Sequence, residues 1–541
     1  MKKITGGQAV VEALEHLKIS TIFGMPGQHN LTIYKALVNS CLKHVSIRHE
    51  QGAGFMADGF ARTSGKIAVA MVISGPGLTN ILTAMGEAYH EAIPMLVIST
   101  NNPSRYLESR TGMLHELAHS NTMVRSVAKE SRRVPHTEAI IPQIVEAYHL
   151  AQTGRPGPVH VEIPLDLLEN EFVRPSLKKL KEMITAPCLS KVSKSLPGFK
   201  AAIQKLKTAR KPFIIVGGGA WQARENIIQL AETLAAPILL THAAKGTIND
   251  DHPLCLSARH HFPVVRNYLN EADVVLAFGT ELGEDVYCNP TSIKGYVIQV
   301  DLDEAAFEKN QKTDICLTAD ASQVAALINE QIQIQPDRLK STYQKVKDIT
   351  KKAVQELPLI FQYKDLNKIL YLLKEVRQAL PQDAILVTDS TKPAYVGFSE
   401  FPSYTPRSFL FPCGYGTLGM ALPAAVGAKL ANPKRVVCVL AGDGGFQFTM
   451  AELGTACQEK LNIPIIIYNN HGLGEIKEYE QESNFDSLIG VYFKNPEFES
   501  LAAAYKIPYY RIQKKGDLQK ALSNSLKLSG PSLIEINVKK S

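Results

Sequence analysis

The chain has 541 residues, of which 45% are hydrophobic and 21% charged, and its formal net charge is +7. This length exceeds what one hydrophobic core accommodates, so we expect several domains, and no apolar stretch reaches the roughly 20 residues that cross a bilayer, which excludes a membrane role. Many basic residues fall between Arg174 and Lys211, in a stretch rich in lysine, serine and proline, which favours a solvated linker over a nucleic-acid-binding surface.

The N-terminal stretch, MKKITGGQAVVEALEHL, has the pattern of an amphipathic helix and lacks the apolar core of a signal peptide. The eight cysteines are scattered without CxxC spacing, which is typical of reduced thiols. Both features predict a cytoplasmic protein.

Short apolar runs bounded by glycine or proline alternate with helical patterns along the chain. We predict a strand in each of the runs at 67–77, 93–100, 158–164, 213–220, 236–243, 272–280, 296–303, 384–390, 436–444, 463–470 and 531–538. Runs that are apolar throughout, without alternation, are typical of parallel strands covered on both faces. The sequence therefore predicts an α/β fold.

Two polar, lysine-bearing gaps, at roughly 174–200 and 336–364, interrupt this pattern. They divide the chain into three doubly wound parallel-sheet domains, which we place at 1–173, 190–335 and 360–541. Ligands of such sheets bind beyond the carboxyl ends of the strands, so the loops after the predicted strands are the places to look for chemistry.

One such loop contains the sequence GDGG, in which Asp443 lies between Gly442 and Gly444 directly after an apolar strand. The following segment is predicted to begin a helix whose first amides can bind an anion. The next predicted strand ends in Asn469 and Asn470, 27 residues beyond the aspartate, so the side chains of Asp443 and Asn470 are expected to meet at neighbouring strand ends. Oxygen ligands of this kind suit Mg²⁺ that in turn holds a diphosphate, although either motif alone would be read as a tight turn or a helix cap.

The central segment VGGGAW, from Val216 to Trp221, resembles part of a dinucleotide-binding loop. It lacks the GxGxxG spacing and no clear acidic residue closes a ribose site. We interpret it as a tight turn between a strand and a helix.

These motifs together resemble the thiamine-diphosphate-dependent family of acetolactate synthases, pyruvate oxidases and 2-oxo acid decarboxylases. The resemblance covers nearly the whole chain and rests on GDGGFQF followed by NN, and on GMPGQHN, RHEQGAGFMADGFART, SGPGLTN, GRPGPVHVEIP and GYGTLGMALPAAVGAKLA, in the order of the family. It implies a pyrimidine-binding, a central and a diphosphate-binding domain. It also implies that each site lies between the first domain of one subunit and the third of another, so that the protein is at least a homodimer, with a homotetramer as the usual form.

The resemblance assigns roles to individual residues. Glu50 would hydrogen-bond the pyrimidine N1′ and so activate the cofactor, Leu418 would support its bent shape, and the carbonyl of Gly416 would accept from its 4′-amino group. Asp443, Asn470 and the backbone oxygen of Gly472 would bind Mg²⁺, and any small residue is expected to serve at position 472. The remaining residues assigned to the cofactor are Pro26, Asn80, Gly442, Gly444 and Asn469.

The reaction implied is decarboxylation of a 2-oxo acid through an enamine intermediate. Protonation of the enamine gives an aldehyde, a second 2-oxo acid gives an acetolactate-synthase-like carboligation, and an oxidant gives an acyl product. A flavin-linked oxidase is therefore an alternative, with FAD possible but not favoured, and a catalytically silent homologue is a further one. The intact Glu50, Asp443 and Asn470 argue against silence.

Other residues bear on the substrate. His115 stands where the synthases carry glutamine and could relay protons, and Gln28 and His29 fall at positions that face substrate in relatives. Glu475 replaces an apolar residue of the synthases, and a carboxylate there would suit a 2-oxo acid with a cationic tail. The segments AYHEAIPMLVIST, MLHEL and GTELGEDVY are similar to segments of guanidino-oxo-acid decarboxylases.

Overall fold

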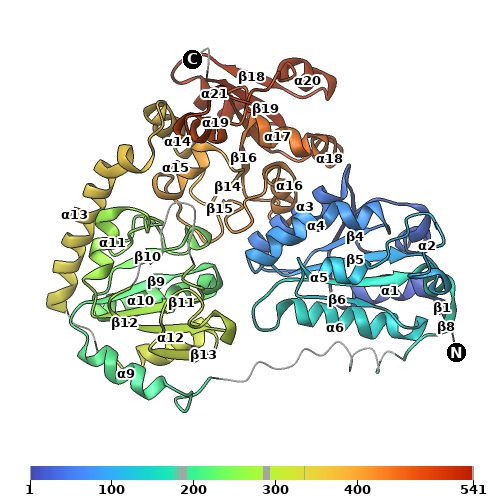
Figure 1. Cartoon of the computed structure of the whole chain (residues 1–541), viewed down its shortest axis with the longest axis horizontal. Coiled ribbons are helices and arrows are strands. Elements are labelled where there is room, and N and C mark those ends of the chain that lie inside the picture. Colours follow the sequence, from blue (N-terminus) through green and yellow to red (C-terminus); the bar gives the residue numbers. More distant parts are fainter. Residues whose placement is uncertain are drawn as a thin grey trace. The chain divides into compact units, whose positions relative to one another are not determined.

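The computed structural model describes residues 2–176, 178, 182, 192–283, 293–333 and 336–538 (Figure 1). The chain forms two compact units. The first contains residues 1–188, 386–391 and 414–541, and the second contains residues 189–385 and 392–413.

The N-terminal part of the first unit is built on a six-stranded parallel sheet with the strand order β3-β2-β4-β5-β7-β6. The two short strands β1 and β8 form a separate antiparallel ribbon. In chain order the elements are β1 (Lys3–Thr5), α1 (Gly6–His16), β2 (Thr21–Gly24), η1 (Gln28–Asn30), α2 (Leu31–Leu37), β3 (Lys43–Ser46), α3 (Glu50–Ser64), β4 (Val69–Val72), α4 (Pro76–His90), β5 (Met95–Asn101), η2 (Ser104–Tyr106), α5 (Ser120–Arg125), β6 (Glu130–Arg133), η3 (Thr137–Ala139), α6 (Ile140–Gln152), β7 (Pro158–Pro164), α7 (Leu165–Glu169) and β8 (Glu171–Val173).

Alternate side chains of these strands pack on opposite faces of the sheet. Val69 and Met71 of β4 share a buried apolar cluster with residues of α1 and α6, such as Val10 and Ile144. The predicted N-terminal helix is confirmed as α1, which begins at Gly6 because the Thr5 side chain caps its first turn. In this sheet β3 lies on one side of β2, whereas β4 and the strands after it lie on the other side. The order of the strands therefore reverses between β2 and β4. Such a switch point is where ligands of doubly wound sheets bind.

The second unit contains a five-stranded parallel sheet with the order β10-β9-β11-β12-β13. Its elements are α9 (Phe199–Thr208), β9 (Pro212–Val216), η4 (Gly218–Ala223), α10 (Arg224–Leu234), β10 (Ile238–Leu240), η5 (His242–Ala244), α11 (Pro263–Asn270), β11 (Val274–Phe278), β12 (Tyr296–Asp301), η6 (Glu304–Ala306), β13 (Ile315–Thr318), α12 (Ala321–Asn329), α13 (Pro336–Ile360), α14 (Leu366–Ala379) and α15 (Lys392–Glu400).

Two sequence interpretations change in this unit. The basic stretch after Arg174 is not a linker throughout, because α9 lies within it and buries Phe199, Ile203 and Leu206 in the core of the central sheet. Parts of that stretch lie outside the described residues. The second polar gap forms α13, a helix of 25 residues whose apolar stripe is buried while lysines occupy other positions. The sequence GTELGEDVY runs from 279 to 287, and its last four residues, 284–287, also lie outside the described residues.

The turn at VGGGAW is confirmed as a tight turn between β9 and η4. A Cβ on Gly217 would lie 2.1 Å from the carbonyl oxygen of Gly279, and the amide of Gly219 donates to the same oxygen at 3.1 Å. Only glycine permits this approach of two backbones. FAD binding by this domain, possible but not favoured from the sequence, is not tested by this turn.

The third sheet has the strand order β15-β14-β16-β17-β19-β18, with β16, β17, β19 and β18 paired in parallel. Its elements are β14 (Ile385–Thr388), β15 (Phe409–Leu410), α16 (Ala421–Ala431), β16 (Val437–Gly442), α17 (Asp443–Thr449), η7 (Met450–Glu452), α18 (Leu453–Gln458), β17 (Pro464–Asn469), α19 (Gly474–Glu482), α20 (Phe498–Ala504), β18 (Tyr509–Ile512), α21 (Asp517–Ser525) and β19 (Ser532–Asn537). The strand order reverses between β14 and β16, which is a second switch point in the first unit.

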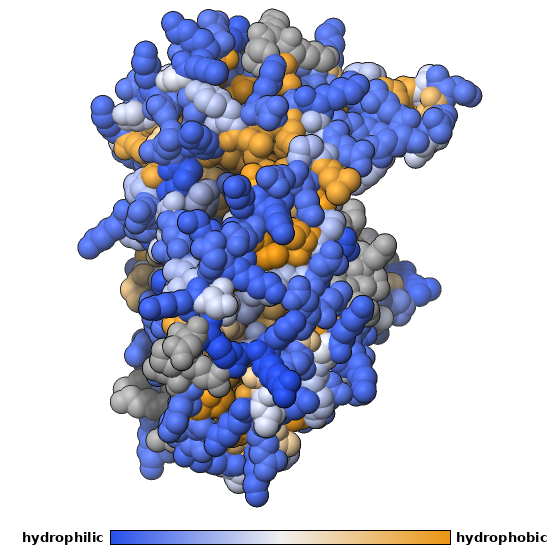
Figure 2. All heavy atoms as spheres, turned by 90° about the vertical axis from the view of Figure 1, so that its left-hand side faces the viewer, coloured by the Kyte–Doolittle hydropathy of each residue, from blue (hydrophilic) through white to orange (hydrophobic). Residues whose placement is uncertain are grey.

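The predicted α/β class with three parallel sheets is confirmed, and each of the predicted strand runs contains an observed strand. The exact domain boundaries stay a prediction, as does a cytoplasmic location. Among the described residues, no helix combines the length and the apolarity that a bilayer span requires. Figure 2 shows one face of the molecule, on which hydrophilic residues predominate and apolar residues form patches between them.

Candidate active site

Glu50 lies at the switch point of the N-terminal sheet. It is the first residue of α3, and only 8% of its surface is exposed. Its Oε2 accepts a hydrogen bond of 2.9 Å from Nδ2 of Asn80, which lies in the first turns of α4. Its Oε1 lies 3.3 Å from the position that a Cβ on Gly77 would occupy, so a side chain at residue 77 would crowd the carboxylate. Asn80 therefore fixes one carboxylate oxygen, and glycine leaves room around the other.

Two histidines that are far apart in the sequence meet at the same end of this sheet. His29, in the short helix η1 after β2, is 6% exposed, and its Nδ1 lies 2.5 Å from Oγ of Ser74. Its ring centroid is 5.4 Å from that of His115. Gly75 has a φ of +61°, and a Cβ on it would lie 2.6 Å from the Cβ of His115, so glycine is required there. Burial, followed by the nearby His115, lowers the pKa of His29, which keeps this imidazole neutral at neutral pH. Gln28, adjacent to His29, is exposed, as is Pro26.

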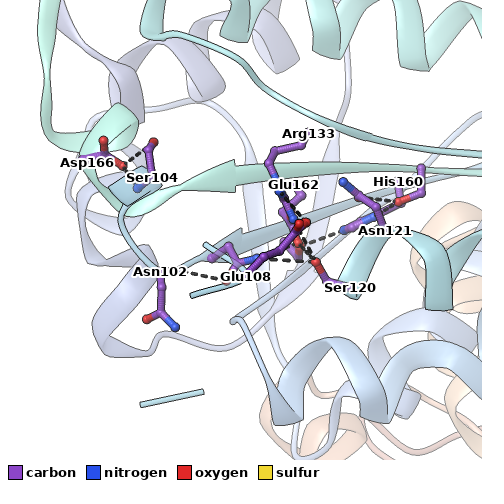
Figure 3. A network of polar contacts seen from close by, with 12 residues as sticks. Asn102, Ser104, Glu108, Ser120, Asn121, Arg133, His160, Glu162 and Asp166 are labelled. Atoms are coloured by element: carbon purple, nitrogen blue, oxygen red, sulfur yellow. Dashed lines mark hydrogen bonds and ion pairs between the residues drawn. The ribbon is translucent and has the colours of Figure 1, made fainter. Parts of the chain in front are cut away.

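His115 belongs to the loop 102–119, and a buried carboxylate holds both ends of this loop (Figure 3). Glu162 of β7 is fully buried, and its Oε1 accepts from Nδ2 of Asn101 at 2.8 Å and from Oγ of Ser120. Its Oε2 accepts from Nε of Arg133, and Arg133 in turn bonds Glu108 within the loop at 3.1 Å. The loop is thereby fixed where it leaves β5, at Glu108, and where it enters α5. Such bonds to a buried charged group are among the stronger ones in proteins.

A second contact holds the start of this loop. Oδ1 of Asp166 accepts from the backbone amide of Ser104 at 2.8 Å and from its hydroxyl at 3.0 Å (Figure 3). The position of His115 is therefore set by residues of β7 and the segment after it. Sequence reasoning did not assign Glu162 or Asp166.

Asp443 lies at the switch point of the third sheet. It is 1% exposed and accepts hydrogen bonds from the backbone amides of Asn470 at 3.2 Å and Gly472 at 3.0 Å, and from Nδ2 of Asn495 at 2.7 Å. Asp443 and Asn470 thus lie together at neighbouring strand ends, joined through the backbone amide of Asn470. The meeting of their side chains stays a prediction. Burial raises the pKa of Asp443, and these hydrogen bonds oppose that effect.

Asn470 has an amide oxygen with an unusual environment. This Oδ1 is buried and has no hydrogen-bond partner among the residues that the structure describes. Beside it lies the buried Asp443 carboxylate, which bonds neutral donors only in the described parts of the chain. A buried carboxylate and an amide oxygen that both lack a cation match the donor set that Mg²⁺ prefers.

Gly472 is held closely by the segment around Val491. A Cβ on it would lie 1.9 Å from the carbonyl oxygen of Val491, and its φ is +156°. The expectation that any small residue would serve at position 472 is therefore wrong, because alanine would collide with a backbone atom.

The other residues assigned around the diphosphate take different positions. Gly442 precedes α17, and a Cβ on Gly444 would lie 3.0 Å from the Phe493 ring. Asn469 is 2% exposed and points into the domain, where its Nδ2 donates to Glu535 at 2.7 Å and its Oδ1 accepts from Asn495 at 2.9 Å. Asn469 therefore supports the loop through neighbouring side chains.

The segment 414–419 presents Gly416 and Leu418. Its flanks are fixed, because the amide of Gly414 donates to Glu91 at 2.7 Å, Oγ1 of Thr417 donates to Glu87 at 3.2 Å, and the amide of Gly419 donates to Asp389 at 2.9 Å. Gly416 has a φ of +67° and open space around it. Leu418 is half-buried and is not part of the described apolar core. A leucine held on a fixed loop but not buried is suited to contact a ligand.

Comparisons with known proteins match this arrangement. The description "Thiamine pyrophosphate enzyme, N-terminal TPP binding domain" matches residues 4–123, the central domain of the same family matches residues 199–328, and its C-terminal TPP binding domain matches residues 394–536. The chain belongs to the thiamine pyrophosphate enzyme family. It is an enzyme of the family that the sequence predicted, and thiamine pyrophosphate is another name for thiamine diphosphate.

The relatives within this family are of two kinds. The chain is 37% identical to a protein of Pseudomonas aeruginosa named "Probable 2-ketoarginine decarboxylase", over 99% of this chain and 94% of that protein. It is 30% identical to the large subunit of acetolactate synthase isozyme 1 of Escherichia coli, over 99% and 94%, and 30% identical to a protein of Methanococcus aeolicus named "Probable acetolactate synthase large subunit", over 99% and 92%. The predicted likeness to 2-oxo acid decarboxylases and acetolactate synthases is confirmed.

In this thiamine pyrophosphate enzyme, Glu475 lies in the first turn of α19, directly after the loop of Asn470 and Gly472. It is half-buried, and its hydrogen bond with the hydroxyl of Tyr479, one turn further on, contributes to the raised pKa of that tyrosine, for which burial is the largest cause. Its position directly after the loop of Asn470 and Gly472 follows from the sequence. A role of Glu475 in substrate binding stays a prediction.

Sequence reasoning missed several residues of the enzyme's site. Asn495 bonds Asp443 but comes from a polar segment 52 residues later, and Asp389 was placed in a predicted strand without a role. The signal that could have found Asp389 is a carboxylate at the end of an apolar strand, the same signal that identified Asp443. Burial raises the pKa of Asp389 to about 6, and it anchors Gly419 in front of α16.

Proposed function

We propose that this enzyme uses thiamine diphosphate and Mg²⁺ to decarboxylate a 2-oxo acid with a cationic tail, and that it protonates the product to release an aldehyde. The observation that carries the proposal is the pair His29 and His115, which meets at the same end of the N-terminal sheet as Glu50: His115 lies against Gly75, and Glu50 lies next to Gly77, two residues further on. The full-length likeness to a protein named as a 2-ketoarginine decarboxylase supports the same substrate class.

The residues present fit both groups. Asp443, the amide oxygen of Asn470 and the carbonyl of Gly472 would hold Mg²⁺, since the first two are buried oxygens that bond no cation among the described residues. Glu50, the carbonyl of Gly416 and the Leu418 side chain would hold the cofactor. When bound, thiamine diphosphate supplies a carbon nucleophile for the 2-oxo group and accepts the electron pair that departing CO₂ leaves behind.

Side chains of the protein would hold and transfer the protons of the proposed reaction. Glu50 is kept in place by Asn80 and would hold the proton that it shares with N1′ of a bound pyrimidine. Neutral His29 can accept a proton at physiological pH, and Ser74, bonded at its Nδ1, can pass one on. A proton donor at this end of the sheet would favour protonation of the product over addition of a second 2-oxo acid.

The cationic tail is assigned to Glu475. Its carboxylate lies at the start of α19, next to the loop that carries Asn470, and it is half-buried, so an ion pair with a guanidinium would be only partly screened by water. The carboxyl group of such a substrate would then point toward the chemistry and its tail toward α19.

Two copies of the chain are required in this proposal. Within one chain Glu50 contacts the first turn of α4 at Gly77, whereas the loop 414–419 contacts its last turn through Thr417 and Glu87. Ten residues separate Gly77 from Glu87, which in a helix spans about 15 Å. One pyrimidine ring does not reach from Glu50 to Gly416 over that distance, which supports a site shared between copies in a homodimer or homotetramer.

The substrate class is tested by turnover with a panel of 2-oxo acids. The enzyme, thiamine diphosphate and Mg²⁺ are incubated with pyruvate, 2-oxobutyrate, branched, aromatic and guanidino 2-oxo acids, and CO₂ and products are measured. We expect the guanidino acid to have the highest kcat/KM and to give an aldehyde. Glu475→Gln should lower kcat/KM for that substrate by about tenfold or more and leave pyruvate nearly unaffected. Glu482→Gln, an exposed glutamate at the other end of α19, is the control. Equal losses for both substrates would contradict the role of Glu475.

The shared site is tested by mixing inactive variants. Glu50→Gln and Asp443→Asn each remove one half of the site, and the two variants are produced together in one cell. If the halves come from different copies, random dimers recover about a quarter of the wild-type activity, because half of them contain one intact site of two. Absence of recovery, with mixed dimers demonstrated by differential tags, would place both halves in one chain.

Carboligation is the second candidate, favoured by the identity of 30% to acetolactate synthases over nearly the whole chain. Formation of acetolactate from pyruvate at a rate matching CO₂ release would select it over the decarboxylase.

A further inference from the structure

Three histidines form a cluster in the second unit, outside the site described above. His242 begins η5, directly after β10, and His260 and His261 lie just before α11. One ring nitrogen of each lies within 4.8 Å of the others, and in the described parts of the chain no other set of three histidine, cysteine or acidic side chains is grouped in this way for a metal ion. His261 is 1% exposed and His242 is 9% exposed, so the cluster is largely shielded from water.

The three rings are arranged to converge. Their centroids are 4.4 Å, 5.5 Å and 5.9 Å apart, and the interplanar angles are 52°, 81° and 66°. Zinc binds imidazole nitrogen at about 2.0–2.1 Å, so ring centres lie about 3.1 Å from the ion and about 5.1 Å from one another in a tetrahedral site. The observed distances scatter around that value.

The rings are also held in place by aromatic neighbours. The His242 ring stacks on Phe398 of α15 at 3.8 Å with an angle of 8°, and the His261 ring contacts Phe262 and Phe361 at 4.6 Å and 5.7 Å. A ligand set whose orientation is fixed by packing loses little side-chain freedom when an ion binds.

The two cationic side chains nearest to the cluster in the sequence each pair with a carboxylate. Lys245, three residues after His242, is fully buried and bonds Asp250 at 2.8 Å and Ser257 at 3.0 Å. Arg259, directly before His260, bonds Glu400 at 3.1 Å. Each neighbouring cation therefore has its own carboxylate. Sites of three neutral histidines and a water hold zinc in other proteins without a carboxylate ligand.

We propose that His242, His260 and His261 bind one divalent transition-metal ion of the zinc type, with a water in the fourth position. The ion links the end of β10 to the segment before α11 and so fixes two loops of the central sheet. Imidazole ligands suit Zn²⁺, Cu²⁺, Ni²⁺ and Co²⁺ and do not suit the Mg²⁺ proposed for Asp443, which prefers oxygen. The ion is a structural link that is independent of the proposed reaction.

The test uses the full-length protein without an affinity tag, stripped of metal by a chelator and then held in excess thiamine diphosphate and Mg²⁺. Zn²⁺ binding is measured by competition with a chromophoric chelator, and Co²⁺ is added separately to record its visible absorption. We expect one tightly bound Zn²⁺ per chain and the intense Co²⁺ bands of a four-coordinate site. The double variant His260→Gln/His261→Gln should bind Zn²⁺ about a hundredfold more weakly or worse, and should lose the bands. His136→Gln, which changes an exposed histidine in the loop after β6, should behave as wild type.

The stability of the same samples gives a second measurement. Zn²⁺ should raise the melting temperature of the wild-type protein and of His136→Gln but not of the double variant, since an ion that binds only the folded chain stabilises it. Equal Zn²⁺ affinity in the wild type and the double variant would show an adventitious ion only. If the double variant fails to fold, the single variant His260→Gln, compared by the Co²⁺ spectrum, decides the question. Weak octahedral Co²⁺ bands in the wild-type protein would overturn the proposal.

Discussion

The contact between α3 and α16 allows a sharp test, because it joins the helix that begins with Glu50 to the helix that follows Leu418. A Cβ on Gly427 of α16 would lie 1.9 Å from the carbonyl oxygen of Met56, and a Cβ on Gly59 of α3 would lie 2.0 Å from the carbonyl oxygen of Ala424. Ordinary van der Waals contacts of a Cβ begin at 3.4 Å, so alanine at either position forces the helix backbones apart by about 1.5 Å. Neither colliding atom belongs to a flexible side chain.

Gly427→Ala should therefore destabilise the first unit by about 3 kcal/mol, at the upper end of the range for overpacking, because the neighbour that must move is a helix backbone. For a unit of this size that corresponds to a fall in melting temperature of about 3–6 °C. The measurement is thermal unfolding followed by circular dichroism at fixed protein concentration. Gly530→Ala is the matched control, since a Cβ there meets nothing within 4 Å. A melting temperature of Gly427→Ala equal to that of Gly530→Ala would refute the close packing of α3 on α16.

Three further predictions concern the site and its surroundings. Asn470→Ala should weaken Mg²⁺-dependent cofactor binding by about tenfold or more, measured by fluorescence titration, with the melting temperature of the cofactor-free protein unchanged because its Oδ1 has no partner among the described residues. Glu162→Gln should leave the fold intact but lower kcat and shift its pH profile, because the loop of His115 loses the charged acceptor for Ser120 and Arg133; an unchanged profile would contradict this. Burial raises the pKa of Glu87 from 4.5 to about 8, so the folded protein retains a proton that the unfolded chain releases, and stability should fall as the pH rises from about 5 to 9. Glu87→Gln should show a smaller fall in melting temperature over that range, and an equal fall would assign the pH dependence to other groups.

The strands that the sequence predicted and those that it missed differ in their place in the sheets. Every predicted run is apolar throughout, as a strand covered on both faces must be, and each contains an observed strand. The strands β1, β2, β3, β6, β8, β13, β15 and β18 were missed. Of these, β3, β6, β13, β15 and β18 lie at the edges of the large sheets, where one side is open to water and a sequence such as KHVS or ESRR suffices. The missed strand β2 lies inside its sheet, but it has only four residues, TIFG. Hydrophobic periodicity detects burial, so it detects edge strands poorly.

Among the site residues as well, some were predicted and others were missed, but for a different reason. Asp443 and Asn470 were found because each follows an apolar strand and the two strands are neighbours. Asn495 and Glu162 were not found, because Asn495 belongs to a segment without regular periodicity and Glu162 lies inside an apolar strand, where a carboxylate is paired with residues that only the fold brings near. Local motifs predict residues whose neighbours are set by strand order, whereas partners from distant loops depend on tertiary contacts.

The proposed site uses residues from both switch points of the first unit. This explains why α3 and α16 pack so closely against each other. In the proposed function, Glu50 acts from the start of α3 and Leu418 from the loop just before α16. The two helices are fixed to each other by glycines where a side chain would collide. The buried Arg62 of α3, which bonds Asp58 and Glu87, strengthens the same region, and Glu87 in turn bonds Thr417 of the loop before α16. In the proposed function, the two half-sites of one chain lie at opposite ends of α4 and are held to each other by these contacts. Closing them on one ligand would then take a second copy, and the rigidity of one chain would set the geometry that the pair of copies presents.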